Sequence, residues 1–101
     1  MTDALFACSD EQALGAYTAL HRRGLRVPDE VSVVGFDDLP LAAWATPALT
    51  TVRQPLAEMA GRATHDLLRR IAGEPQRTSH VEMATALVLR ESTKTLEQAG
   101  A

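Results

Sequence analysis

The pattern of apolar and polar positions divides the chain into short apolar runs separated by amphipathic stretches. Short runs rich in apolar or β-branched residues, at 4–8, 31–36 and 49–53, predict strands. The run at 31–36 is mostly apolar, which is typical of a strand buried in a parallel sheet. Residues 81–90 predict either one long strand or two short ones.

Helical spacing of apolar residues predicts helices between these strands. Ser9 stands at the N-cap of the first helix, with Gln12 in the capping-box position, and Gly24 follows its last turn. Residues 55–71 predict a second helix with a proline at its first position and apolar residues at helical spacing. A short helix is expected at 39–45.

The order strand, helix, strand over residues 4–36 is typical of a β-α-β unit. Its strands are expected to be parallel, with a right-handed crossover, so the fold class is α/β with a parallel β-α-β sheet. Ligands of open α/β folds bind at the carboxyl ends of the strands. Ser9 and Asp10 share that edge with Asp37 and Asp38, and we expect a ligand site there.

Asp37 and Asp38 follow a strand directly and are the leading candidates for chemistry. Carboxylates accept hydrogen bonds, which suits a ligand that donates them, such as a sugar. A catalytic pair would need a nearby nucleophile or base, and magnesium would need more oxygen ligands than the sequence offers. We expect Asp37 and Asp10 to contact the ligand and Asp38 to accept structural hydrogen bonds. Ser9 is either a helix cap alone or a cap that also faces the ligand.

Composition narrows the class of protein. The chain has 101 residues, 46% of them hydrophobic, and a net charge of −3, which predicts one small packed domain without the basic stripe of a nucleic-acid binder. Cys8 is the only cysteine, so no internal disulfide is expected and a reducing cytoplasm fits. Cys8 itself is expected to be a buried core residue. We expect no metal, no cofactor, no signal peptide and no membrane span.

Four ordered motifs are distributed along the chain between residues 4 and 93. Residues 4–16 resemble the pattern F-A-x-N-D-x-x-A-L-G-A, with Ser9 in place of its Asn, and residues 24–38 resemble G-L-x-V-P-x-D-V-S-V-V-G-F-D-D. Residues 49–55 match L-T-T-V-x-Q-P, and residues 87–93 match L-V-x-R-x-S-T. Together these motifs resemble the LacI/GalR family of bacterial transcriptional regulators.

The resemblance implies part of a two-lobed, periplasmic-binding-protein-like (type I) effector domain. It assigns residues 1–54 to the C-terminal lobe, 55–85 to a helix and strand of the N-terminal lobe, 86–93 to a return strand and 94–101 to a flexible tail. Since the resemblance places the sheet partners of the helix outside this chain, the helix is expected to expose part of its apolar stripe. The implied function is sugar sensing in the cytoplasm by a homodimeric regulator with no enzyme activity. Operator DNA would be bound only by a helix-turn-helix that this chain does not contain.

The resemblance also implies roles for individual residues. Asp37 matches a position that commonly bonds ligand hydroxyls, whereas Ser9 stands where the family has a ligand-binding Asn and lacks its amide group. The surroundings of Leu14, Tyr17 and Trp44 resemble the dimerisation surface. A purely intramolecular core face is an equal alternative for Leu14 and Tyr17.

Two other functional classes stay open at this point. A sugar-binding component of a transporter shares the implied fold. A small α/β enzyme that uses Asp37 and Asp38 is the second alternative.

Overall fold

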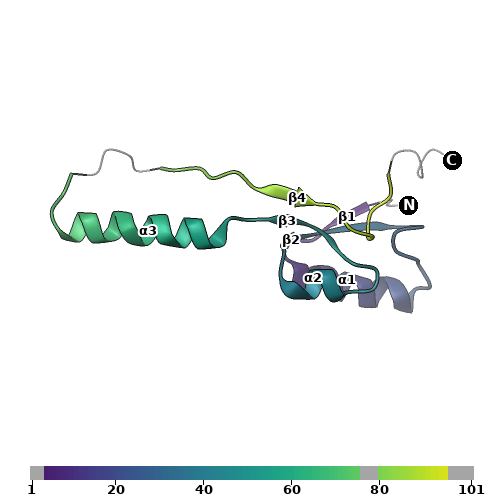
Figure 1. Ribbon diagram of the computed structural model, residues 1–101. Helices are drawn as coiled ribbons and strands as arrows, with labels where there is room; N and C mark the ends of the chain where they lie inside the picture. Colours follow the sequence, from purple (N-terminus) through teal and green to yellow (C-terminus); the bar gives the residue numbers. More distant parts are fainter. Residues whose placement is uncertain (1–3, 76–79, 96–101) are drawn as a thin grey trace. The chain divides into compact units, whose positions relative to one another are not determined.

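The computed structural model describes residues 4–75 and 80–95 (Figure 1). Two compact units make up the chain, one built from the residues up to Arg53 and from Ala86 onward, the other from Gln54–Thr85. The first unit contains β1 (Ala4–Phe6), α1 (Asp10–Arg22), β2 (Ser32–Asp37), α2 (Pro40–Trp44), β3 (Thr50–Arg53) and β4 (Ala86–Val88). The second unit contains α3 (Leu56–Ile71).

The first unit is a four-stranded sheet in the order β1-β2-β3-β4. The pairs β1–β2 and β2–β3 are parallel, which confirms the predicted α/β fold with its β-α-β unit. The pair β3–β4 is antiparallel. Both predictions for residues 81–90 are wrong. Only Ala86–Val88 pair with the sheet, so there is no long strand. Residues 81–85 form no strand, so there are not two short strands either.

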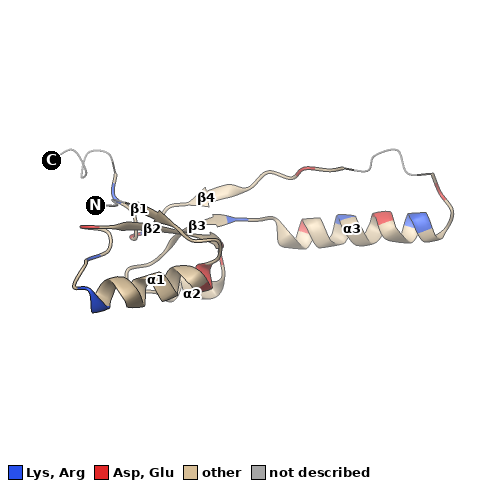
Figure 2. Ribbon diagram, turned by 180° about the vertical axis from the view of Figure 1, so that it is seen from behind, with Lys and Arg blue, Asp and Glu red and all other residues tan. Residues whose placement is uncertain are grey.

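The core lies between the sheet and the two helices α1 and α2, which cover the same face (Figures 1 and 2). Val33 and Gly35 of β2 are buried, while the residues between and beside them are half-buried, as the two-residue period of a strand requires. The buried apolar residues are Ala7, Ala13, Val31, Val33, Ala42 and Leu49. Three of these six residues are alanines, whose small side chains occupy little space in the core.

The start of α1 is capped as its sequence predicts. The backbone amide of Gln12 donates to Oγ of Ser9 at 3.2 Å, and Gln12 Oε1 accepts from the amide of Cys8 at 3.1 Å. Gly24 ends the helix with a φ of 72°, a conformation that glycine adopts without strain. The expectation of a buried Cys8 is wrong, because β1 ends at Phe6 and Cys8 lies exposed in the connection to α1.

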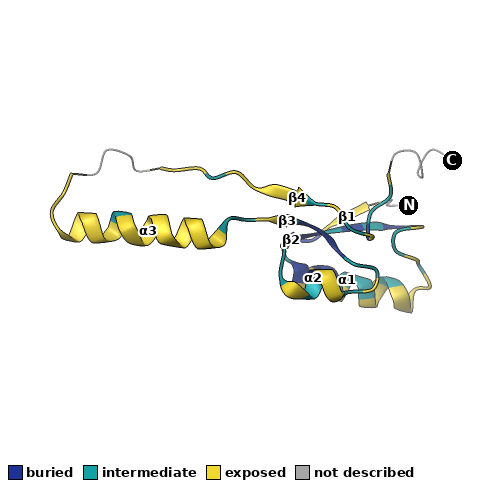
Figure 3. Ribbon diagram, in the orientation of Figure 1, coloured by how far each residue is buried: buried dark blue, intermediate teal, exposed yellow. Residues whose placement is uncertain are grey.

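The second unit is dominated by α3, which has no buried residue (Figure 3). Its apolar side chains are exposed, as expected, at Leu56, Met59, Leu67, Leu68 and Ile71. Acidic and basic residues alternate along the helix (Figure 2) and include an ion pair of 3.2 Å between Arg62 and Asp66. Pro55 takes the N-cap rather than the first helical position. Within residues 4–75 and 80–95, no helix has the length and apolar character needed to span a membrane.

Candidate functional site

The carboxyl end of β2 has an unusual backbone. Asp37 and Asp38 have φ angles of 118° and 59°, a region that residues other than glycine rarely occupy. Each such residue costs on the order of 1–3 kcal/mol and persists only where surrounding contacts fix it. The side chains of Asp10 and Asp38 provide such contacts.

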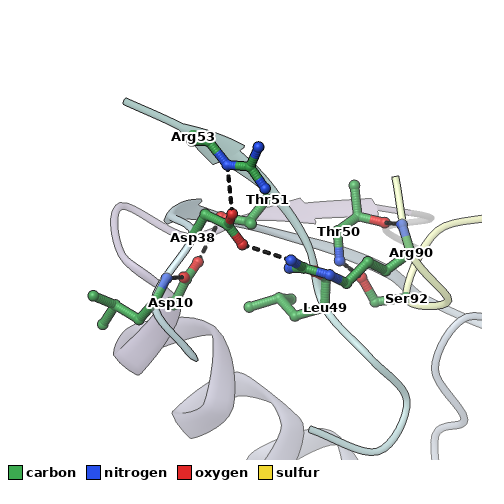
Figure 4. Close-up of polar contacts among 9 residues, drawn as sticks. Asp10, Asp38, Leu49, Thr50, Thr51, Arg53, Arg90 and Ser92 are labelled. Atoms are coloured by element: carbon green, nitrogen blue, oxygen red, sulfur yellow. Dashed lines mark hydrogen bonds and ion pairs between the residues drawn. The ribbon is translucent and has the colours of Figure 1, made fainter. Parts of the chain in front are cut away.

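Asp10, in the first turn of α1, bonds to both the loop after β2 and the neighbouring strand. Its Oδ2 accepts from the amide of Leu39 at 2.7 Å, and its Oδ1 accepts from the hydroxyl of Thr51 at 2.6 Å (Figure 4). Asp10 is fully buried, and the N-terminus of α1 favours its negative charge. Gly35 leaves the space for this carboxylate, because a Cβ there would overlap Asp10 Oδ1 and lie 2.8 Å from Leu49 Cδ2.

These contacts change the role expected for Asp10. Both of its oxygens are bonded to groups of the chain itself, and the side chain is shielded from solvent. These bonds favour a structural role for Asp10, while its contact with a ligand stays a prediction.

Asp38 bonds two arginines that are distant in sequence. Its Oδ2 lies 2.8 Å from Nε of Arg53, and its Oδ1 lies 2.7 Å from Nη2 of Arg90 (Figure 4). Burial raises the pKa of the Asp38 carboxyl, but the hydrogen bonds from Arg90 and Arg53 outweigh this effect, so the pKa lies below its ordinary value. Asp38 is thus the structural acceptor that was expected, with guanidinium groups as its partners.

A second polar cluster fixes the segment that carries Arg90. Oγ of the buried Ser92 donates to the carbonyl of Val33 at 2.5 Å and accepts from the amide of Thr50 at 2.8 Å. The amide of Arg90 donates to the Thr50 hydroxyl at 2.9 Å (Figure 4). Sequence reasoning assigned no role to Arg53, Arg90 or Ser92. The motif at residues 87–93 contains Arg90 and Ser92, whereas Arg53 stands at the variable position of the motif at residues 49–55.

Ser9 and Asp37 lie at the same edge of the sheet. Ser9 directly precedes Asp10, and Asp37 stands two residues before Leu39, so the hydrogen bond between Asp10 and Leu39 brings their backbones to one region. Both side chains are half-buried, and Ser9 Oγ also caps α1. Contact of either residue with a ligand stays a prediction.

The three residues predicted for the dimer surface differ in their surroundings. Trp44 is 79% exposed, whereas Leu14 is half-buried. Tyr17 packs against the core, and its hydroxyl donates to the carbonyl of Pro47 at 2.8 Å, which favours the intramolecular alternative for this residue.

A cavity of about 200 Å³ lies at the other end of α1 from Asp10. Its lining residues are Tyr17, His21, Leu25, Arg26, Val27, Thr46 and Pro47. It includes none of the residues predicted to bind the ligand, so the candidate site rests on the edge of the sheet and not on this cavity.

The residues that make these contacts lie within the part of the chain that is similar to known proteins. The family model of the periplasmic binding protein-like domain matches residues 1–93. The ribose operon repressor of Halalkalibacterium halodurans is 44% identical over 92 residues, which cover 91% of this chain and 28% of that protein. The regulator MalR of Streptomyces coelicolor is 48% identical over 90 residues, covering 89% of this chain and 26% of that protein.

Solved structures give the same result. The complex of the transcriptional regulator CelR with cellobiose superposes with a TM-score of 0.84 at 41% identity, covering 89% of this chain and 28% of that one. The chain thus spans little more than a quarter of the length of these relatives. The relatives are transcriptional regulators, which decides against the transporter alternative. The chain belongs to the LacI family of transcriptional regulators and corresponds to part of their periplasmic binding protein-like, effector-binding domain.

Proposed function

We propose that this chain forms one side of the sugar-binding cleft of a LacI-family regulator, with Asp37 and Ser9 contacting hydroxyl groups of the effector. The observation that carries the proposal is the strained backbone at Asp37, which lies at the carboxyl end of a parallel strand between the contacts of Asp10 and Asp38. Strain of this kind is often found where a protein presents a group to a ligand. Similar proteins have been solved with cellobiose and with sucrose.

The regulator would act by a shift between two arrangements of its effector domain. A sugar that binds one arrangement more tightly stabilises it and thereby changes the affinity for operator DNA. Operator binding would come from a part of the regulator outside this chain. We further propose a cytoplasmic homodimer whose interface includes Trp44 and Leu14. No covalent step is needed for this function, and the relatives are a repressor and a transcriptional regulator.

Calorimetric titration of the intact regulator with cellobiose and sucrose tests the ligand contact of Asp37. Asp37→Ala is expected to weaken binding at least tenfold, because a hydroxyl bonded to a carboxylate loses its acceptor. Asp29→Ala is the matched control, since Asp29 is an exposed carboxylate of the same unit whose ion pair with Arg26, at 3.7 Å, lies away from the candidate site. Equal affinities of Asp37→Ala and the unaltered protein would contradict the proposal.

Ser9→Asn separates the capping role of Ser9 from its ligand role. Serine and asparagine are equally good N-caps, so the free energy of unfolding should change little. The added amide is expected to alter the affinity for cellobiose or sucrose. If neither affinity changes, Ser9 is a cap alone.

A further inference from the structure

The guanidinium group of Arg90 contacts two different segments beside the candidate site. Its Nη1 donates to the carbonyl of Leu49 at 2.9 Å, and its Nη2 lies 2.7 Å from Asp38 Oδ1. The planar guanidinium thus bridges the start of β3 and the loop after β2. The side chain of Arg90 is 18% exposed and that of Asp38 is 9% exposed. Such shielding makes an ion pair stronger than the usual surface pair.

The segment around Arg90 does not depend on this bridge. Ser92 bonds to Val33 and Thr50, and the backbone amide of Arg90 bonds to the Thr50 hydroxyl. The guanidinium group is therefore available to fix Asp38. Since Asp38 and Asp37 are adjacent and both have positive φ angles, fixing one carboxylate restricts the backbone that carries the other.

We propose that Arg90 is a positioning residue for effector binding, which acts through Asp38 to fix the backbone that presents Asp37. This inference rests on the proposed contact between Asp37 and the effector. Arg53 supports the same carboxylate, but its side chain is 59% exposed and it has no second bond comparable to that of Arg90 with Leu49 among those described. Arg90 is therefore expected to have the larger effect of the two.

The test uses the intact regulator and titration with cellobiose and sucrose. Arg90→Met removes both guanidinium contacts, and Arg90→Lys keeps the charge but cannot bridge two acceptors in the same way. Arg26→Met is the matched control, because Arg26 forms an exposed ion pair of 3.1 Å with Glu30 in the same unit. Thermal unfolding establishes that each variant is folded.

We expect Arg90→Met to weaken sugar binding about tenfold, Arg90→Lys to weaken it less, and Arg26→Met to leave it unchanged. Crystal structures of the Arg90 variants should show Asp37 and Asp38 with changed φ angles. A double-mutant cycle with Asp38→Asn separates positioning from general stabilisation, because Arg90→Met should have little further effect on affinity once Asp38 has lost its charge.

The outcomes distinguish the two proposals. If Asp37→Ala weakens binding but Arg90→Met and Arg90→Lys do not, the positioning role is wrong and the proposed function stands. If Asp37→Ala leaves binding unchanged, the proposed function is wrong, and the positioning role of Arg90, which depends on it, is wrong as well. Additive effects of Arg90→Met and Asp38→Asn on affinity would also overturn the positioning role.

Discussion

Asp10 accepts a hydrogen bond of 2.7 Å from the backbone amide of Leu39, a residue 29 positions further along the chain. The same carboxylate accepts a bond of 2.6 Å from Thr51 in β3. One buried side chain therefore connects the start of α1, the loop after β2 and the neighbouring strand.

Removal of the Asp10 carboxylate is expected to destabilise the protein. Asp10→Ala leaves the amide of Leu39 and the hydroxyl of Thr51 without acceptors, which should lower the free energy of unfolding by about 3 kcal/mol. Asp10→Asn should cost less, because its oxygen can accept from Leu39 while its amide donates to Thr51. Urea unfolding measures the free energy of unfolding of both variants. Equal losses in Asp10→Ala and Asp10→Asn would contradict the stabilising role of these hydrogen bonds.

Gly35→Ala and Gly15→Ala should have effects of opposite sign. A Cβ on Gly35 would overlap Asp10 Oδ1 and crowd Leu49, so we expect a loss of about 2 kcal/mol. Gly15 lies within α1 with open space around its Cα, and alanine there should add up to about 1 kcal/mol through its helix propensity. Differential scanning calorimetry measures the melting temperature of both variants. Shifts of the melting temperature in the same direction would contradict the prediction.

Ser92→Ala removes a hydroxyl that both donates and accepts in the core. The Thr50 amide and the Val33 carbonyl would lose this partner, at an expected cost of about 2 kcal/mol. Ser32→Ala is the control, since the half-buried Ser32 accepts only from the amide of Lys94, at 3.1 Å, among its described bonds. Urea unfolding should show the smaller loss for Ser32→Ala.

Stability should depend on the ionisation of Asp38. Its pKa is held below the ordinary value in the folded protein, so its contribution is present above the pKa of the unfolded chain and is lost as the pH falls through the folded value. The difference in free energy of unfolding between the unaltered protein and Asp38→Asn should therefore shrink below about pH 4. Unfolding curves from pH 7 to pH 3 measure it, and a difference that stays constant would be evidence against this ionisation.

Trp44→Ser tests the proposed dimer. Because Trp44 is 79% exposed, loss of its side chain should weaken self-association of the intact regulator without unfolding it. Tyr17→Phe is the comparison, since it removes the bond to Pro47 within one chain and should change stability alone. Sedimentation velocity measures the fraction of dimer in each variant. A dimer that persists in Trp44→Ser would show that Trp44 does not belong to the interface.

Local patterns predicted much of the first unit correctly. The apolar run before Asp37, the cap at Ser9 and the glycine at 24 are each determined by a few neighbouring residues, so strand, helix and parallel pairing followed from them. The shared edge of Asp10 and Asp37 followed from the geometry of parallel strands.

The partners of the acidic residues could not be predicted in the same way. Asp38 and Arg90 are separated by 52 residues, and their contact depends on β4 pairing antiparallel to β3, for which the chain carries no local signal. Asp10 was predicted to contact the ligand, and no local pattern indicates its bonds to Leu39 and Thr51, which lie 29 and 41 positions further along the chain. Cys8 was misplaced because β1 is two residues shorter than its apolar run.

The contacts of Asp38 also determine the charge of the edge beside the proposed ligand. Two carboxylates, Asp37 and Asp38, stand with two guanidinium groups, those of Arg53 and Arg90, so the formal charges of the four residues cancel. A neutral sugar can bond to Asp37 without disturbing this balance. At the contact proposed for Asp37, a phosphorylated sugar would instead add negative charge beside that carboxylate.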